Sequence, residues 1–142
     1  MKYFVKTEDV ETQGFSWGTL QWLNEPQVTG SKVMVTGVVN LFPGEGHQRH
    51  NHEGCEEVLY VLKGTGVQSL ELDTGKVEKE IEAGELIRIP AGVYHSTINN
   101  GKDPLEILAI YHYSGPDTRL DSSTNNPLAS TASLAPQTLP YG

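Results

Sequence analysis

The sequence predicts an all-β fold, and three observations support that class. Residues 31 to about 114 contain short runs of valine, isoleucine and leucine that glycine-rich turns separate. In the first of these runs the apolar residues recur with a period of two, which is typical of a strand with one buried face. Helical periodicity is almost absent from the same region. Many short strands with frequent turns indicate a sandwich, a jelly roll or a small barrel, and 142 residues give room for one such domain.

Apolar runs and turn residues place the strands in order along the middle of the chain. Val35, Val39 and Leu41 share the parity of Val33, which opens the first run. The Asp-Thr-Gly sequence at 73–75 is a hairpin signal, because glycine accepts a positive φ. The predicted strands cover residues 33–41, 57–62, 67–72, 76–81, 86–89 and 105–113.

Composition divides the chain into three segments. Residues 1–30 are mixed and contain Trp17 and Trp22, so we expect this segment to pack on the barrel or in a dimer interface. Residues 31–114 form the predicted barrel. Residues 115–142 are rich in Pro, Ser and Thr and form a tail, either a flexible coil or an arm that docks its leucines on a neighbouring surface.

Charge and composition exclude several partners. A formal net charge of −8, with scattered Lys and Arg, argues against nucleic acid or an anionic membrane as the partner. No apolar run approaches the roughly 20 residues that cross a bilayer, and acidic residues follow the first apolar residues too early for a signal peptide. The single cysteine, Cys55, cannot form an intramolecular disulfide. We therefore expect a cytoplasmic protein.

Four residues are candidate metal ligands. His50 and His52 are two apart, a spacing that places both imidazoles on one face of a strand. A glycine-containing turn before Glu57 could form a hairpin that returns its carboxylate to the same face. His95 follows the Pro-Ala-Gly turn at 90–92. Three imidazoles and a carboxylate suit one divalent ion of Zn, Fe, Mn, Ni, Co or Cu, although His-x-His alone is a weak signal.

The framing glycines and prolines give these residues a family resemblance. The chain resembles the cupins, whose first motif, G-x5-H-x-H-x4-E-x6-G, is matched at every position by Gly44, His50, His52, Glu57 and Gly64. The second motif, G-x5-P-x-G-x2-H-x3-N, is also matched throughout, by Gly84, Pro90, Gly92, His95 and Asn99. Together the two motifs cover about two-fifths of the chain.

The resemblance implies a double-stranded β-helix, a jelly-roll barrel with the metal inside. It also implies that His50, His52, Glu57 and His95 hold that metal. Because small cupins are frequently dimers, and an open edge strand favours pairing, we expect a homodimer. On physical grounds the motif glycines should allow tight turns, and Asn99 should be a structural hydrogen-bonding residue.

Residues next to the motifs have weaker claims. We expect His47 to be an exposed histidine at the rim of the barrel, and Glu56 to face the surface. Cys55 should occupy a turn near the site rather than bind the metal. On the last strand, Tyr111 and Tyr113 become pocket walls or hydrogen-bond donors if they face inward. If His112 faces inward instead, it is a candidate general base, and the sequence leaves these alternatives open.

The cupin fold hosts many activities, so ligands alone do not name the reaction. We expect a non-redox enzyme of lyase, isomerase or cyclase type, acting on a small oxygenated substrate such as a sugar acid, a keto acid or a polyketide-like enol. Its metal would polarise a carbonyl or hydroxyl group. The alternatives are an iron- or copper-dependent dioxygenase and a non-catalytic module that binds or senses a small molecule.

Overall fold

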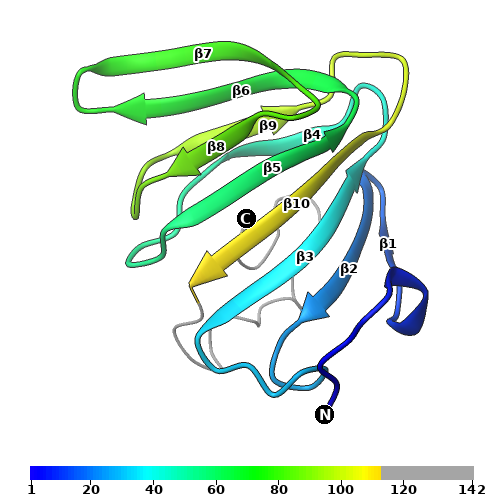
Figure 1. Ribbon diagram of the computed structural model, residues 1–142. Coiled ribbons are helices and arrows are strands. Elements are labelled where there is room, and N and C mark those ends of the chain that lie inside the picture. The colour runs from blue at the N-terminus through cyan, green and yellow to red at the C-terminus, as the bar shows by residue number, and fades with distance from the viewer. Residues whose placement is uncertain (113–142) are drawn as a thin grey trace.

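Two antiparallel sheets form the protein, which confirms the all-β jelly roll (Figure 1). The computed structural model describes residues 1–112. The six-stranded sheet has the order β1-β2-β3-β10-β5-β8, with bounds Gln13–Phe15, Gly18–Asn24, Met34–Leu41, Leu105–His112, Glu57–Lys63 and Leu86–Ile89. The four-stranded sheet has the order β4-β9-β6-β7, with bounds Gly46–His50, His95–Ile98, Thr65–Leu72 and Gly75–Glu82.

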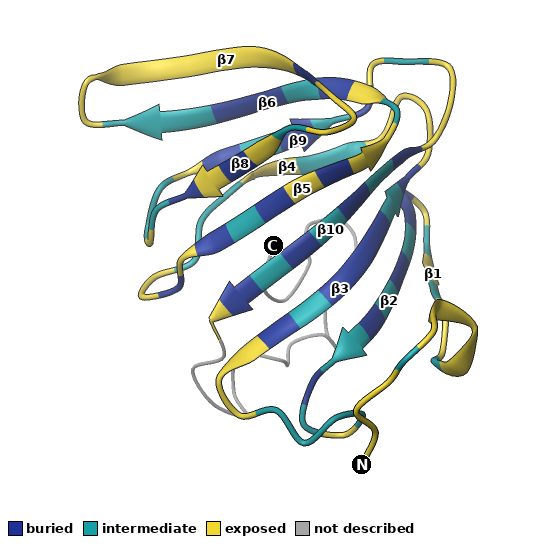
Figure 2. Ribbon diagram, in the orientation of Figure 1, coloured by how far each residue is buried: buried dark blue, intermediate teal, exposed yellow. Residues whose placement is uncertain are grey.

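Alternating burial along the central strands of the larger sheet builds the core (Figure 2). In β10 every second residue is buried, and in β3 Val35, Val39 and Leu41 are at most 3% exposed. Val33 precedes β3 and is 63% exposed, because the strand begins one residue later. The predicted strands at 57–62, 67–72, 76–81 and 86–89 are confirmed as β5, β6, β7 and β8.

The first thirty residues contribute to the larger sheet. Its strands β1 and β2 extend the sheet beyond β3, and β2 pairs with β3 from Gly18 onward. Trp17 and Trp22 are 6% and 5% exposed and belong to the core. In the described part of the chain the helical segment is the 3-10 turn η1, Thr7–Asp9, and no helix there has the length and hydrophobicity to cross a membrane. The predicted tail at 115–142 lies outside the described residues.

The turn and hydrogen-bonding roles expected of the motif residues are confirmed. Gly64 and Gly92 have φ values of +91° and +78°, in the region that favours glycine. A Cβ at position 64 would also lie 2.5 Å from the carbonyl oxygen of Pro104. Asn99 is fully buried and joins the loop between β9 and β10 to the end of β3. Its side chain makes hydrogen bonds with Leu41 O, Asp103 O and Gly101 N.

Candidate metal centre

His50 and His95 lie side by side on adjacent strands of the smaller sheet. His50 is the last residue of β4, and its register partner on β9 is His95. The ring centroids are 4.3 Å apart. The expectation that His95 comes from another strand is therefore confirmed, and the pairing of β4 with β9 sets the distance between the two imidazoles.

His52 reaches the cluster from a loop, so the expectation that it shares a strand with His50 is wrong. Strand β4 ends at His50, and the chain then turns. Two hydrogen bonds tie this turn to the loop before β9: Gly92 N donates to His52 O at 2.9 Å, and Asn51 Nδ2 donates to Gly92 O at 3.0 Å. The loop–loop contact, rather than strand alternation, brings His52 beside His95.

Glu57 comes from the opposite sheet, which corrects the expected hairpin. It opens β5, whose hydrogen-bonded neighbours are β10 and β8, and β5 does not pair with β4. Its side chain is 2% exposed, and Oε1 lies 3.4 Å from Nε2 of His95. The carboxylate therefore faces the histidines across the barrel.

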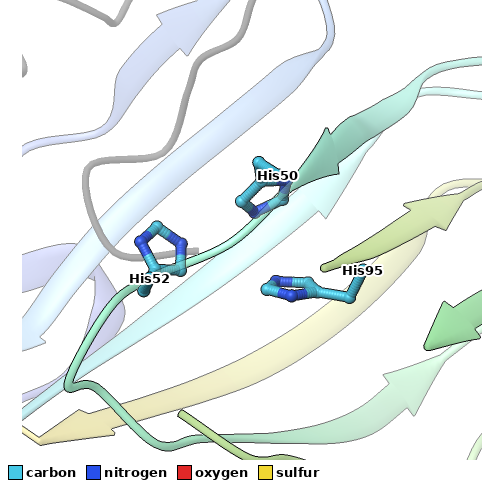
Figure 3. A group of neighbouring side chains, drawn as sticks. All are labelled: His50, His52 and His95. Atoms are coloured by element: carbon cyan, nitrogen blue, oxygen red, sulfur yellow. The ribbon is translucent and has the colours of Figure 1, made fainter. Parts of the chain in front are cut away.

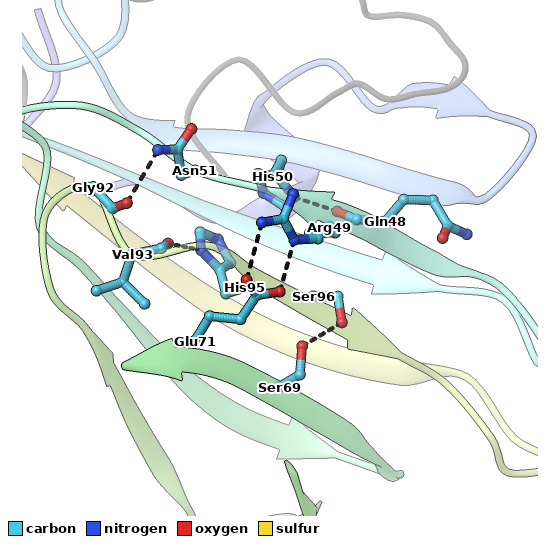
Figure 4. Close-up of polar contacts among 10 residues, drawn as sticks. All are labelled: Gln48, Arg49, His50, Asn51, Ser69, Glu71, Gly92, Val93, His95 and Ser96. Carbon is cyan, nitrogen blue, oxygen red and sulfur yellow. Dashed lines mark hydrogen bonds and ion pairs between the residues drawn. The ribbon is translucent and has the colours of Figure 1, made fainter. Parts of the chain in front are cut away.

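The three imidazoles are arranged to share one metal ion (Figure 3). One ring nitrogen each from His50, His52 and His95 lies within 4.8 Å of the other two. Nδ1 of His50 lies 2.5 Å from Gln48 O, and Nδ1 of His95 lies 2.9 Å from Val93 O (Figure 4). Because a carbonyl oxygen can only accept, both rings carry their proton on Nδ1 and keep the Nε2 lone pair for a metal.

An ion pair on the outer face braces the strands that carry the ligands (Figure 4). Arg49 extends from β4 to Glu71 on β6, with Nε–Oε2 and Nη2–Oε1 distances of 2.7 and 2.9 Å. Its guanidinium also lies 3.8 Å from the centre of the Tyr94 ring. This arginine spans β9 on the outside and contributes no positive charge to the interior.

His47 faces the interior, which corrects the expectation of an exposed rim histidine. The register between β4 and β9 shifts between His47 and His50, so three residues of β4 match two of β9. Such a bulge changes the parity of the strand, and two residues three apart then face the same side. His47 lines the same cavity as His50 and His95. A prediction based on strict alternation misses the inward position of this residue. Its closeness to the first motif was the sequence signal for a place near the site.

The cavity beside the cluster is small, and apolar side chains from the larger sheet form part of its wall. Its volume is about 10 Å³, about the space that one water molecule needs. Its lining residues come from both sheets and are Val39, Leu41, His47, His50, Glu57, Leu59, His95, Thr97 and Ile107. His50 and His52 are partly exposed as whole residues, whereas their Nε2 atoms and that of His95 are buried.

The last strand presents Tyr111 inward and His112 outward. Tyr111 is 1% exposed, whereas His112 is exposed. The idea of an inward His112 acting as a general base is therefore corrected, because Leu105, Ile107 and Ala109 set the buried parity of β10. The charged residue Glu106 could have indicated from the sequence that the even-numbered positions of β10 face outward. Tyr113 lies outside the described residues.

Burial lowers the pKa of two histidines at the site, His47 and His50. Burial and the neighbouring histidines lower the pKa of His47 to about 3, and they hold the pKa of His50 well below its usual value. Neutral imidazole is the form that binds metal. The site is therefore prepared for an ion at neutral pH without displacing protons from these two rings.

These shifts make the metal-free protein sensitive to acid. Between pH 3 and 6.5 the imidazole of His47 is protonated in the unfolded chain but neutral in the folded protein. Because the unfolded state binds the extra proton, the free energy of unfolding rises with pH across that window. Urea titrations at several pH values should show a steeper rise for metal-free wild type than for His47→Gln. Equal slopes would contradict the lowered pKa.

Cys55 should be unreactive in the folded protein. Its side chain is 7% exposed, its Sγ donates to His112 O at 3.5 Å, and burial together with Glu57 raises its pKa to about 11. Its thiol is not part of the candidate metal-binding group formed by the three histidines. Because the thiolate is the reacting form, we expect alkylation by iodoacetamide at pH 7.5 to be at least about 100-fold slower than in urea. Similar rates in both conditions would show that the thiol is accessible.

A model of the cupin domain matches residues 37–111, more than half of the chain. The chain belongs to the cupin family. This match includes both motifs and all four residues expected to hold the metal, and it covers strands β4 to β9 entirely.

Curated relatives and solved structures agree with that assignment. An oxalate-binding protein of Thermotoga maritima is 36% identical over 80 residues, which are 56% of this chain and 63% of that protein. Germin-like protein subfamily 2 member 2 of Arabidopsis thaliana is 31% identical over 93 residues, 61% of this chain and 40% of that protein. The cupin therefore spans about half the length of these relatives. The structure of KdgF from Halomonas sp. has a TM-score of 0.69 at 14% identity, covering 82% of this chain and 98% of KdgF, which shows the shared fold.

Proposed function

We propose that this cupin binds one divalent transition-metal ion through His50, His52, His95 and Glu57, and that it acts as a non-redox enzyme on a small carboxylate. The observation that carries the metal site is the mutual approach of three imidazole nitrogens to within 4.8 Å. Glu57, with Oε1 3.4 Å from His95 Nε2, adds a buried negative charge beside them. This donor set suits first-row divalent ions.

The size of the site supports a small ligand. About 10 Å³ of space remains inside the barrel beside the cluster, so a sugar acid or a polyketide-like enol would have to displace the apolar walls. A keto acid or a short dicarboxylate needs less room than either of these. The name of the Thermotoga maritima relative, an oxalate-binding protein, supports the same class.

Different residues of the chain would hold the metal ligands in place and exclude water from the site. A bound metal would act as a Lewis acid and polarise a carbonyl or carboxylate oxygen. The backbone carbonyls of Gln48 and Val93 fix the rings of His50 and His95. Apolar side chains from the larger sheet exclude water from the far side, which strengthens electrostatic interactions at the site.

The test is metal analysis followed by ligand and turnover assays. We expect about one equivalent of a divalent transition metal per chain after purification without added metal. The loaded protein should bind oxalate or pyruvate in calorimetry, and NMR of a panel of keto acids and dicarboxylates should reveal a product without oxygen uptake. Absence of metal at any loading would contradict the proposed site. Oxygen consumption with iron or copper would replace the non-redox reaction by a dioxygenase.

Binding without turnover is the second candidate, and the outward position of His112 favours it. The last strand was expected to supply a general base, and within the described residues its histidine points away from the cavity. A loaded protein that binds oxalate tightly but converts no member of the panel would select this alternative. The homodimer and the cytoplasmic location stay predictions.

A further inference from the structure

A column of aromatic rings fixes His47 on the inner wall of the barrel. The rings of Phe15 and Trp17 stack with centroids 4.7 Å apart and planes 4° from parallel. Trp17 then meets the His47 ring nearly edge-on, at 4.6 Å and 83°. Trp17 is only 6% exposed. Packing of this kind restricts rotation of the imidazole, so the N-terminal segment decides where its nitrogens point.

The Nε2 atom of His47 is buried and makes no hydrogen bond to any described residue. Its ring lies 6.0 Å from that of His50, and both line the cavity beside the cluster. His47 is nevertheless outside the group of three mutually close ligand nitrogens. A buried polar nitrogen without a partner is costly, and His47 lines the cavity beside the three histidines.

The described part of the cavity lining has no Lys or Arg that could bind an anionic ligand, and Arg49 is engaged with Glu71 on the outer face. The Thr97 hydroxyl also lines the cavity, but it donates to Gln68 Oε1 at 2.5 Å. In a protein with a net charge of −8, an anion at this site needs a local hydrogen-bond donor.

We propose that His47 is a ligand-contacting residue whose side-chain N–H donates to the carboxylate of a small metal-bound ligand. This inference rests on the proposed function and specifies the recognition of its substrate. A carboxylate that binds the metal through one oxygen keeps a second oxygen as an acceptor. A hydrogen bond to this charged oxygen is stronger than one between neutral groups and would select carboxylates over neutral carbonyl compounds.

The experiment compares oxalate binding by Co(II)-loaded wild type with three variants. His47→Phe keeps a flat ring beside Trp17 but has no donor, and His47→Asn keeps an amide that stops short of the Nε2 position. His47→Gln places its amide nitrogen near that position. We expect the dissociation constant of oxalate to rise about 10- to 100-fold in the first two. The Gln variant should stay within about threefold of wild type, and His112→Phe is the matched control on the exposed face.

Metal content and the Co(II) absorption spectrum are measured on the same samples, which separates the possible failures. Unchanged metal content together with weaker oxalate binding in the Phe and Asn variants supports the proposal. If the Phe variant does not fold, the Asn variant alone provides the test. Loss of metal in both would make His47 a metal ligand and overturn it. Equal oxalate binding by wild type and variants overturns this inference alone. Wild type that holds metal but ignores oxalate, or that holds no metal, overturns the proposed function and this inference with it.

Discussion

Replacing both His50 and His95 by alanine should reduce metal affinity about 10⁴-fold. Structural four-ligand sites bind zinc with roughly 10–16 kcal/mol, so each lost nitrogen corresponds to about two orders of magnitude in affinity. The two rings are adjacent register partners whose Nδ1 atoms are both held by backbone carbonyls. Competition with a chromogenic chelator measures the affinity. Added metal should raise the melting temperature of wild type but not that of the double variant.

Two controls make this result specific. His112→Ala removes an exposed imidazole from β10 and should leave affinity within about twofold of wild type. Circular dichroism of the metal-free double variant shows whether the barrel still forms. If the folded double variant retains one tightly bound equivalent, the ion lies elsewhere and the ligand assignment is wrong.

Replacing Asn99 by alanine should lower the free energy of unfolding by about 2–4 kcal/mol. This side chain is 0% exposed. Its Nδ2 donates to Leu41 O at 2.9 Å and to Asp103 O at 2.8 Å, while Gly101 N donates to Oδ1 at 2.9 Å. Truncation would leave backbone groups without their partner inside the fold. Urea unfolding of the metal-free protein measures the loss without a contribution from metal binding.

Two further variants separate hydrogen bonding from packing at this position. Asn99→Asp keeps the shape but replaces the donating amide by an oxygen facing two carbonyls, so it should destabilise at least as much as alanine. Asn100→Ala changes an exposed neighbour and should alter stability by less than about 0.5 kcal/mol. Equal stability of Asn99→Ala and Asn100→Ala would contradict the structural role.

The positions of the main strands along the chain and the motif turns could be predicted from sequence because their causes are local. Alternation around Val35 and Val39 reports which face of a strand is buried, and this depends on residues two apart. The turn at Gly92 needs a positive φ, which glycine accepts at low cost. The family motifs added the four expected metal ligands, of which the structure brings three histidines into one group with Glu57 beside His95.

Contacts between distant segments decided the rest of the site. The bulge between His47 and His50 changed the parity of β4, and Glu57 arrived from the facing sheet rather than along a hairpin. Trp17, thirty residues from His47 in sequence, fixes the orientation of that ring. The sequence by itself determined the fold class, the turns and the family's metal-binding motifs, because these depend on short-range spacing. The tertiary structure alone decided which polar atoms share the interior, because sheet packing joins residues whose separation no local pattern records.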